Sequence, residues 1–130
     1  MTSPPTVLIV EDEPDLLDLF EIYFEDNYRV VTAGFGGEAL EKLSVEVDVI
    51  VLDRALPDMS GEDFLEKAPN IKDVGVIVVS GFESDSKIKG LQFDKYLKKP
   101  VSREELTTAV DSLVDDVSTT SGMRDSTSVA

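Results

Sequence analysis

Short apolar runs alternate along the chain with segments whose apolar residues recur at helical spacing. The runs predict strands that are buried on both faces, which is typical of a parallel sheet covered by helices. In chain order, the predicted strands are Val7–Val10, Arg29–Ala33, Val47–Leu52, Val74–Val79 and Lys95–Lys98.

The segments between these runs predict helices. Pro14 suits the first position of a helix, and the apolar residues of Asp15–Asp26 then fall on one helical face. Ser102 is an N-cap candidate for the last helix, with Glu105 at the capping-box position. The other predicted helices are Glu38–Leu43, Glu62–Ala68 and Ser84–Leu91, and the last one extends to Val117.

Five strands that alternate with five helical segments predict an α/β fold. We expect a doubly wound five-stranded parallel sheet with right-handed crossovers and the flavodoxin-like strand order 2-1-3-4-5. A chain of 130 residues fits one domain. We assign residues 1–117 to that domain and residues 118–130, which are rich in Ser and Thr, to a flexible tail.

The charge balance narrows the possible partners. The chain has 27 acidic and 12 basic residues, for a net charge of −15. Such a surface repels phosphates, so direct binding of duplex nucleic acid is not expected. A charge this large also opposes compaction, and concentrated salt screens it, so we interpret the composition as halophilic; the alternative is an ordinary acidic cytosolic protein.

The residue inventory excludes several kinds of site. The chain has no cysteine and no histidine, so it has no disulfide, no thiolate or imidazole metal ligand and no histidine phosphocarrier. The first six residues lack the pattern of a secretory signal. The longest apolar run, Val74–Val79, is far shorter than the ~20 residues of a membrane span. We therefore expect a soluble, cytoplasmic protein.

Polar residues follow four of the five predicted strands. They are Glu11 and Asp12 after the first strand, Asp53 after the third, Ser80 after the fourth and Lys99 after the fifth. In the order 2-1-3-4-5 these four strands are neighbours, and ligands bind outside the carboxyl ends of such strands. We expect three carboxylates, a hydroxyl and an ammonium group to meet at one edge of the sheet.

Carboxylates this close repel one another unless a cation or a proton lies between them. Oxygen ligands completed by water are what Mg²⁺, or alternatively Mn²⁺, prefers. We expect Asp12 and Asp53 to bind the metal directly, Glu11 to act through water and the backbone carbonyl of Ala55 to supply a further oxygen.

The same edge is suited to holding a phosphoryl group. A carboxylate oxygen of Asp53 would be the nucleophile, Lys99 and the metal would neutralise the phosphoryl oxygens, and Ser80 would donate a hydrogen bond. Each motif alone has an ordinary explanation, such as acids at a helix N-terminus or a turn after a strand. Their joint occurrence at four strand ends favours phosphoryl chemistry.

Four segments of the chain resemble the receiver domains of two-component response regulators. The resemblance covers about residues 6–117 and rests on VLIVEDEP, VLDRALPDMSG, VIVVSG and DKYLKKP, which begin at residues 7, 51, 76 and 94. The acidic composition indicates a haloarchaeal member. The resemblance implies Asp53 as phosphoacceptor, Glu11 and Asp12 as metal-site acids, Ser80 as switch hydroxyl, Lys99 as phosphate partner, Tyr96 as switch aromatic and a cis bond before Pro100.

The resemblance also implies a function. A receiver domain accepts a phosphoryl group from a sensor histidine kinase or a histidine phosphotransfer protein, with a divalent cation, and changes conformation to signal. It is a signalling domain and not an enzyme, with only self-phosphorylation and slow autodephosphorylation. No direct nucleic acid or membrane partner is expected, and the kinase, the output and homodimerisation on phosphorylation are left open.

Three further positions carry expectations. In this family, the residues two positions after the phosphoacceptor and two positions after the switch hydroxyl influence dephosphorylation. In this chain they are Ala55 and Phe82. Neither side chain can orient a water molecule, so we expect a long-lived phosphorylated state. Ile22 lies opposite the apolar face of the first helix and is a candidate contact for the phosphodonor.

The chain also departs from the family pattern. Glu11 replaces the commoner Asp, and the segment between Ser80 and Lys99 looks one helical turn short, which predicts a stunted fourth helix.

Other interpretations remain at this stage. A haloacid-dehalogenase-like phosphatase would also use an Asp nucleophile but requires a second acid where this chain has Ala55. A flavodoxin-like electron carrier would have to bind phosphate in a first loop that is acidic here. A pseudo-receiver that binds partners without phosphorylation is the third alternative.

Overall fold

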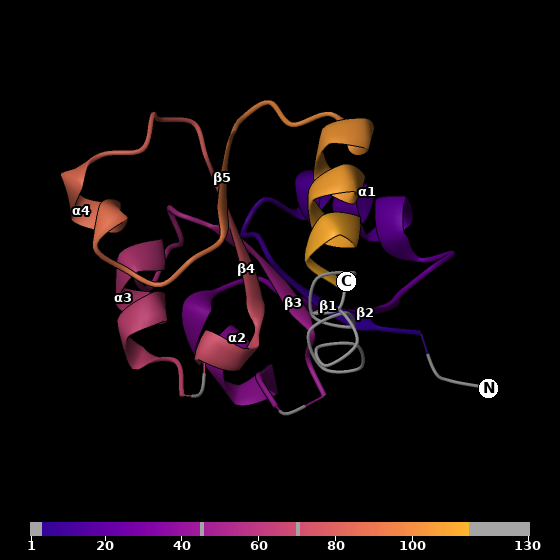
Figure 1. Ribbon diagram of the computed structural model, residues 1–130, viewed down its shortest axis with the longest axis horizontal. Coiled ribbons are helices and arrows are strands. Elements are labelled where there is room, and N and C mark those ends of the chain that lie inside the picture. Colours follow the sequence, from indigo (N-terminus) through magenta and orange to yellow (C-terminus); the bar gives the residue numbers. More distant parts are fainter. Residues whose placement is uncertain (1–3, 45, 70, 115–130) are drawn as a thin grey trace, which may run out of the picture.

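A computed structural model of the chain describes residues 4–44, 46–69 and 71–114. The five strands are β1 (Thr6–Val10), β2 (Arg29–Ala33), β3 (Val49–Asp53), β4 (Gly75–Ser80) and β5 (Lys95–Lys98). They form one parallel sheet in the order β2-β1-β3-β4-β5, as predicted (Figure 1).

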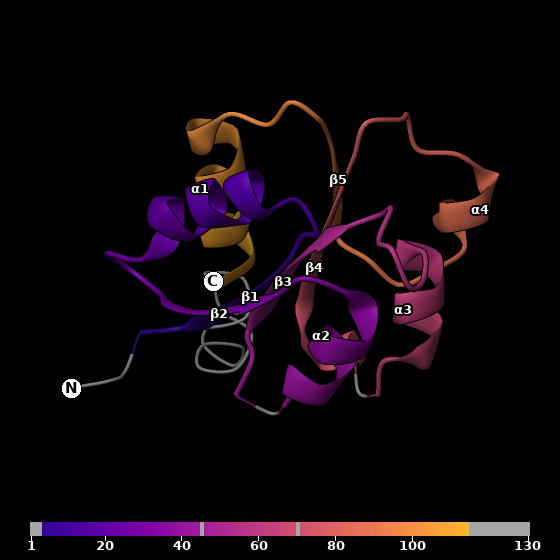
Figure 2. The same cartoon turned by 180° about the vertical axis from the view of Figure 1, so that it is seen from behind.

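Helices cover both faces of this sheet. They are α1 (Pro14–Phe24), α2 (Gly36–Lys42), α3 (Gly61–Lys67), the 3₁₀ helix Ile71–Asp73, α4 (Ser86–Lys89) and a last helix over residues 103–114. Figures 1 and 2 show α1 and the last helix on one side of the sheet, with α2, α3 and α4 on the other. The fold is therefore the doubly wound one that the alternating pattern predicted.

Alternate residues of the central strands enter two separate cores. Leu8, Ile50 and Val78 lie in the core beneath α2, α3 and α4, whereas Ile9 and Val51 lie in the core beneath α1 and the last helix. Because successive side chains of a strand point to opposite faces, a run that is apolar at every position is what a sheet covered on both sides requires.

The observed ends of several elements differ from the predicted ones by one or two residues. The third strand starts at Val49 and not at Val47, and the side chain of Asp48, just before it, accepts a hydrogen bond from the backbone N–H of Thr6 at 2.8 Å. Helix α2 starts at Gly36, two residues earlier than predicted, because its first N–H groups find an acceptor on another loop.

The fourth helix is stunted, as predicted, and is shorter than the predicted segment Ser84–Leu91. Helix α4 has only four residues, with Asp85 at its N-cap and Gly90 at its C-cap. Glycine is a poor helix former, and its place here explains the early end. Ile88 is nonetheless fully buried, so even this short helix contributes to the core.

The last helix begins as predicted, since the backbone N–H of Glu105 donates to the hydroxyl of Ser102 at 3.0 Å. Its predicted end at Val117 and the predicted tail, residues 118–130, lie outside the described residues. Within the part of the chain that the structure describes, no helix has the length and apolar character needed to cross a membrane.

Candidate functional site at the carboxyl edge of the sheet

The polar residues predicted to meet at the carboxyl edge of the sheet do so. Glu11 and Asp12 directly follow β1, Asp53 is the last residue of β3, Ser80 is the last residue of β4, and Lys99 directly follows β5. These four strands are neighbours in the sheet, so their ends bring together residues that are far apart in the sequence.

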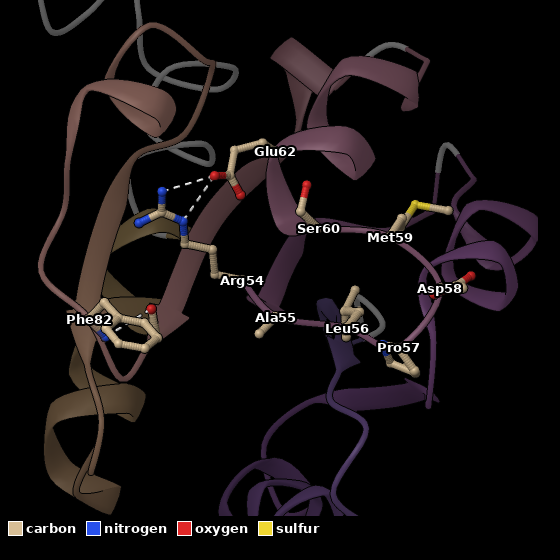
Figure 3. Close-up of a pocket in the computed structure, with 10 residues that line it drawn as sticks. Arg54, Ala55, Leu56, Pro57, Asp58, Met59, Ser60, Glu62 and Phe82 are labelled. Carbon is tan, nitrogen blue, oxygen red and sulfur yellow. Dashed lines mark hydrogen bonds and ion pairs between the residues drawn. The ribbon is translucent and has the colours of Figure 1, made fainter.

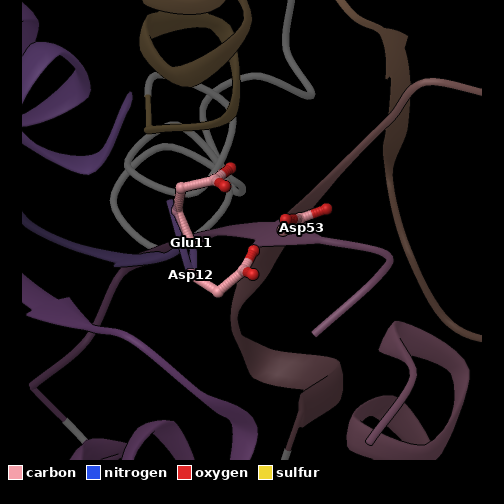
Figure 4. A group of neighbouring side chains, drawn as sticks. All are labelled: Glu11, Asp12 and Asp53. Atoms are coloured by element: carbon pink, nitrogen blue, oxygen red, sulfur yellow. The ribbon is translucent and has the colours of Figure 1, made fainter. Parts of the chain in front are cut away.

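Three carboxylates form the centre of the site (Figure 4). One oxygen of each of Glu11, Asp12 and Asp53 lies within 4.8 Å of the others. Glu11 and Asp53 are buried, with 2% and 4% of their surface exposed, whereas Asp12 is exposed. The backbone N–H of Ala55 donates to Oδ1 of Asp53 at 3.1 Å, which fixes the orientation of this carboxylate.

Lys99 supplies the positive charge of the site. Its Nζ lies 3.2 Å from Oε1 of Glu11 and 3.5 Å from Oδ2 of Asp53. Its backbone N–H donates to the carbonyl of Ser80 at 2.7 Å, which ties the end of β5 to the end of β4. The peptide bond between Lys99 and Pro100 is cis, as the resemblance implied.

Burial and mutual repulsion set the electrostatics of the cluster. Burial, together with the charge of Asp53, raises the pKa of Glu11 to about 7, although Lys99 acts in the opposite direction. Burial also raises the pKa of Asp53 above its ordinary value, against the effects of the Ala55 N–H and of Lys99. Burial lowers the pKa of Lys99, but the two carboxylates more than offset this, so that its pKa lies above its ordinary value.

The donor set fits a hard divalent cation. All its groups are carboxylate oxygens, which Mg²⁺ and Mn²⁺ prefer. Two oxygens bound to one Mg²⁺ are at most about 4.2 Å apart, twice the usual bond length, and a ligand that acts through water can lie farther away. The 4.8 Å limit on the separations in this cluster is therefore close to what a bound ion needs.

Ser80 and Tyr96 both contact the loop that follows β4. The buried Oγ of Ser80 accepts a hydrogen bond from the backbone N–H of Phe82 at 3.0 Å. Tyr96 is half-buried, and its hydroxyl donates to the carbonyl of Phe82 at 2.9 Å. The predicted switch hydroxyl and switch aromatic are thus joined through one residue of the loop.

A surface pocket of about 450 Å³ lies beside the site (Figure 3). Ser80, Ala55 and Phe82 contribute to its lining, together with the loop from Arg54 to Ser60. Phe82 is 75% exposed. The two positions expected to influence dephosphorylation therefore line one pocket.

The sequence analysis missed Arg54, which lies directly after Asp53. Its guanidinium group donates to Glu62, to Asp85 and to the hydroxyl of Tyr96. Its side chain is only 10% exposed. The sequence shows only that a charged residue follows a buried strand. The spacing of residues along the chain could not identify the hydrogen-bond partners of Arg54.

Asp58 was missed as well. Its two carboxylate oxygens accept hydrogen bonds from the backbone N–H groups of Gly36 and Gly37, both at 2.8 Å. These are the first residues of α2, which has no cap of its own, so Asp58 satisfies N–H groups that a helix start leaves free. It thereby joins the loop after Asp53 to the loop after β2.

Ile22, the predicted partner contact, is exposed on α1, as the helical spacing indicated. It is 53% exposed, and Leu19 lies one helical turn before it and is also exposed. Its contact with the phosphodonor stays a prediction.

Comparisons with known proteins agree with this geometry. The family model "Response regulator receiver domain" matches residues 7–111. The chain is 35% identical over 113 residues to the response regulator SaeR of Staphylococcus epidermidis, which covers 83% of this chain and 49% of the relative. It is 37% identical over 121 residues to a putative transcriptional regulator of Haloferax volcanii, which covers 92% of this chain and 21% of the relative. The chain thus spans half or less of these relatives, and the second match fits the halophilic interpretation.

Solved structures show the same fold. A CheY-like response regulator receiver domain protein from Methanospirillum hungatei is similar with a TM-score of 0.82 and 30% identity, covering 88% of this chain and 97% of that one. The signal receiver domain of a putative Luxo repressor protein from Vibrio parahaemolyticus is similar with a TM-score of 0.78 and 29% identity, covering 88% and 92%.

Proposed function

Because this chain belongs to the response regulator receiver domain family, we propose that it accepts a phosphoryl group on Asp53. The donor is a sensor histidine kinase or a histidine phosphotransfer protein, and the reaction depends on Mg²⁺ or Mn²⁺. The observation that carries the proposal is the cluster of three carboxylates around Asp53, with Nζ of Lys99 at 3.5 Å from its Oδ2. Receiver domains are signalling domains, and we propose no turnover of substrate beyond self-phosphorylation and slow autodephosphorylation.

The transfer forms one bond and breaks one. A carboxylate oxygen of Asp53 forms the new O–P bond while the P–N bond of the donor phosphohistidine breaks. The electron pair of that bond stays on the imidazole nitrogen, which then takes a proton. Such a step depends mainly on positioning and charge neutralisation, and the N–H of Ala55 and the ammonium group of Lys99 act on the carboxylate and on the phosphoryl oxygens.

We propose that the acidic cluster holds the metal. Asp12 and Asp53 would bind it directly, Glu11 would act through water, and the carbonyl of Ala55 would supply a further oxygen. The bound ion supplies positive charge against the phosphoryl oxygens. The all-oxygen donor set supports this assignment, as do the short distances within the cluster.

Ser80 and Tyr96 are the proposed switch. The hydroxyl of Ser80 accepts one hydrogen bond, from Phe82, which leaves its own proton for a phosphoryl oxygen. A move of Ser80 toward Asp53 frees space near β5, into which Tyr96 can turn. Phosphorylation then acts as a population shift between two arrangements of the same residues.

Phosphorylation by a small donor tests the proposal. Incubation with acetyl phosphate and Mg²⁺ should add the mass of one phosphoryl group to the intact protein, and chelation of the metal should prevent this. Asp53→Asn should remain unlabelled, whereas Asp18→Asn, a matched change at an exposed position of α1, should label as the wild type does. Labelling of Asp53→Asn would refute the assignment, and continuous release of phosphate would indicate a phosphatase.

A further inference from the structure

The loop between β3 and α3 reaches the proposed site through Ala55. The backbone N–H of Ala55 donates to Oδ1 of Asp53 at 3.1 Å, and its carbonyl is the oxygen that we assign to the metal. The position of this loop therefore affects both the orientation of the phosphoacceptor and the binding of the ion.

The two ends of the loop are tied to each other. The backbone N–H of Gly61 donates to the carbonyl of Arg54 at 2.6 Å, and Ala55 and Ser60 form an isolated antiparallel bridge. A Cβ atom at Gly61 would lie 2.9 Å from Cα of Arg54, so this close approach requires glycine. The closed base leaves residues 56–59 as a separate tip.

Helix α2 holds this tip through Asp58. The two carboxylate oxygens of Asp58 accept hydrogen bonds from the backbone N–H groups of Gly36 and Gly37, each at 2.8 Å. Figure 3 shows Asp58 on the side of the loop that lies away from Arg54. The hydrogen bonds from Gly37 and Gly36 lower the pKa of Asp58 below its ordinary value, so both oxygens are available as acceptors.

Met59 packs against the same helix start. A Cβ atom at Gly36 would lie 2.5 Å from Cγ of Met59, so the loop and the helix approach each other where position 36 has no side chain. A Cβ atom at Gly34, two residues earlier, would have its nearest neighbour at 3.9 Å. The close contact between the loop and α2 therefore lies at Gly36.

Apolar packing alone does not fix the position of the tip. Leu56 and Met59 pack against the core beneath α2, α3 and α4, but such contacts have no preferred direction. A hydrogen bond requires its donor and acceptor within a narrow range of distance and angle. The paired hydrogen bonds of Asp58 thus set where the tip lies relative to α2, and Pro57, whose φ is fixed by its ring, stiffens the connection to Ala55.

We propose that Asp58 is a positioning residue for metal binding. By holding the loop against α2, it keeps the two backbone groups of Ala55 in place beside Asp53 and the metal. The inference rests on the proposed function, because that function places the ion at the acidic cluster. Removal of a group that orients metal ligands typically weakens metal binding by about 10- to 100-fold. Because Asp58 acts through the intervening chain, we expect the lower figure.

Two other roles of Asp58 predict different results. Helix α2 has no side-chain cap of its own, so a role in capping alone would lower stability when Asp58 is removed and leave metal affinity unchanged. An effect of charge alone would be screened by concentrated salt and would be absent from variants that keep every charge. The proposal requires weaker metal binding whenever the loop is released from α2.

Calorimetric titration with Mg²⁺ at pH 8 and matched salt tests the proposal. Asp58→Asn keeps one acceptor and loses the other, and it should bind Mg²⁺ about tenfold more weakly than the wild type. Glu38→Gln is the matched control. Glu38 also accepts from a backbone N–H near the start of α2, that of Gly34 at 2.8 Å, but it belongs to the helix and not to the loop. This control should lose stability and keep its Mg²⁺ affinity.

Glycine variants repeat the comparison without a change of charge. Gly36→Ala displaces Met59 and should weaken Mg²⁺ binding by about fivefold or more, as expected for a typical coupling between sites. Gly34→Ala, where there is room for the added methyl group, should bind Mg²⁺ as the wild type does. Weaker binding in Asp58→Asn alone would assign the effect to charge and overturn the proposal.

Amide hydrogen exchange measures the hydrogen bonds of Asp58 themselves. Because coupling between two sites is reciprocal, Mg²⁺ should slow the exchange of the Gly36 and Gly37 amides in the wild type by up to about tenfold, although neither residue is a proposed ligand. In Asp58→Asn, Mg²⁺ should no longer affect these amides. The measurement on the wild type tests the proposal even if the variant does not fold.

The outcomes separate this inference from the proposed function. Equal Mg²⁺ affinities of Asp58→Asn and Glu38→Gln, or exchange at Gly36 and Gly37 that does not respond to Mg²⁺, would overturn the role of Asp58 even if the wild type is phosphorylated normally. Failure of the wild type to bind Mg²⁺ and to label with acetyl phosphate would instead refute the proposed function.

Discussion

Lys99 and Glu11 form an ion pair at the carboxyl edge of the sheet, although Glu11 is almost completely buried. Nζ of Lys99 lies 3.2 Å from Oε1 of Glu11. The same ammonium group lies 3.5 Å from Oδ2 of Asp53, so the two buried carboxylates share one positive charge.

Lys99→Met should destabilise the metal-free protein at pH 8. Removal of the ammonium group leaves two buried carboxylates without a positive charge beside them. Loss of one partner of a buried ion pair costs several kcal/mol of stability. Because Lys99 is partly exposed, we expect a loss of about 2–3 kcal/mol. The loss should shrink at pH 5, because Glu11, whose pKa is raised to about 7, is then protonated and carries no charge. Urea unfolding at matched salt measures the effect. Lys98→Met, which removes an exposed pair with Glu83, should change stability little, and an equal loss in both variants would contradict the prediction.

The metal-free protein should lose stability as the pH rises from about 5 to 8. The folded state holds a proton on Glu11 up to a pKa of about 7, against an ordinary value of 4.5. Between these values the folded protein binds more protons than the unfolded one, so the free energy of unfolding falls with rising pH. Glu11→Gln should abolish most of this slope, and an unchanged slope in thermal melts of that variant would show that another group is responsible.

Mg²⁺ should stabilise the protein more at pH 8 than at pH 6. The ion competes with the proton on Glu11, so its apparent affinity should fall by up to about tenfold for each pH unit below 7. Because a ligand of the folded state raises the melting temperature according to its affinity, melts with and without Mg²⁺ at both pH values measure this. Equal stabilisation at both would argue against binding at this cluster.

The phosphorylated state should be long-lived. Ala55 and Phe82 line the pocket beside Asp53, and neither side chain can orient a water molecule toward the phosphorus atom. Ala55→Asn and Phe82→Glu each introduce a polar group that can, and should shorten the lifetime by about tenfold or more. Decay of the labelled protein at matched salt, followed by intact mass, is the measurement. A wild type that decays as fast as the variants would show that these positions do not set the lifetime.

Ile22→Ser should impair phosphotransfer from the cognate kinase without affecting the fold. Ile22 and Leu19 form an exposed apolar pair on α1, and loss of one central apolar contact costs an interface about 1–2 kcal/mol, or roughly tenfold in affinity. Labelling by acetyl phosphate, which needs no docking surface, should be unchanged and serves as the control. Normal transfer from the kinase would exclude Ile22 from the contact.

The sequence alone was sufficient for the framework and for the main site residues. Apolar runs with no polar position predict strands buried on both faces, and this property depends on the residues themselves. Once the strand order was inferred, the positions of Asp12, Asp53 and Ser80 followed, because parallel strands end at the same edge. The stunted fourth helix was also visible, as a segment too short for the usual turns.

Tertiary structure decided the electrostatics and the connections between loops. The spacing could not show that Glu11 is buried deeply enough to hold a proton near neutral pH, since burial depends on what packs around it. The sequence analysis placed Asp48 inside the third strand. Its side chain accepts a hydrogen bond from the backbone of Thr6, 42 residues away, and the sequence alone could not reveal this contact.

The contacts of Arg54 are of the same kind. Its partners lie 8, 31 and 42 residues away. Hydrogen bonds between side chains require positions fixed to within a few tenths of an ångström, and only the folded chain fixes them. The sequence determines which groups reach the edge of the sheet, and the packing determines which of those groups touch.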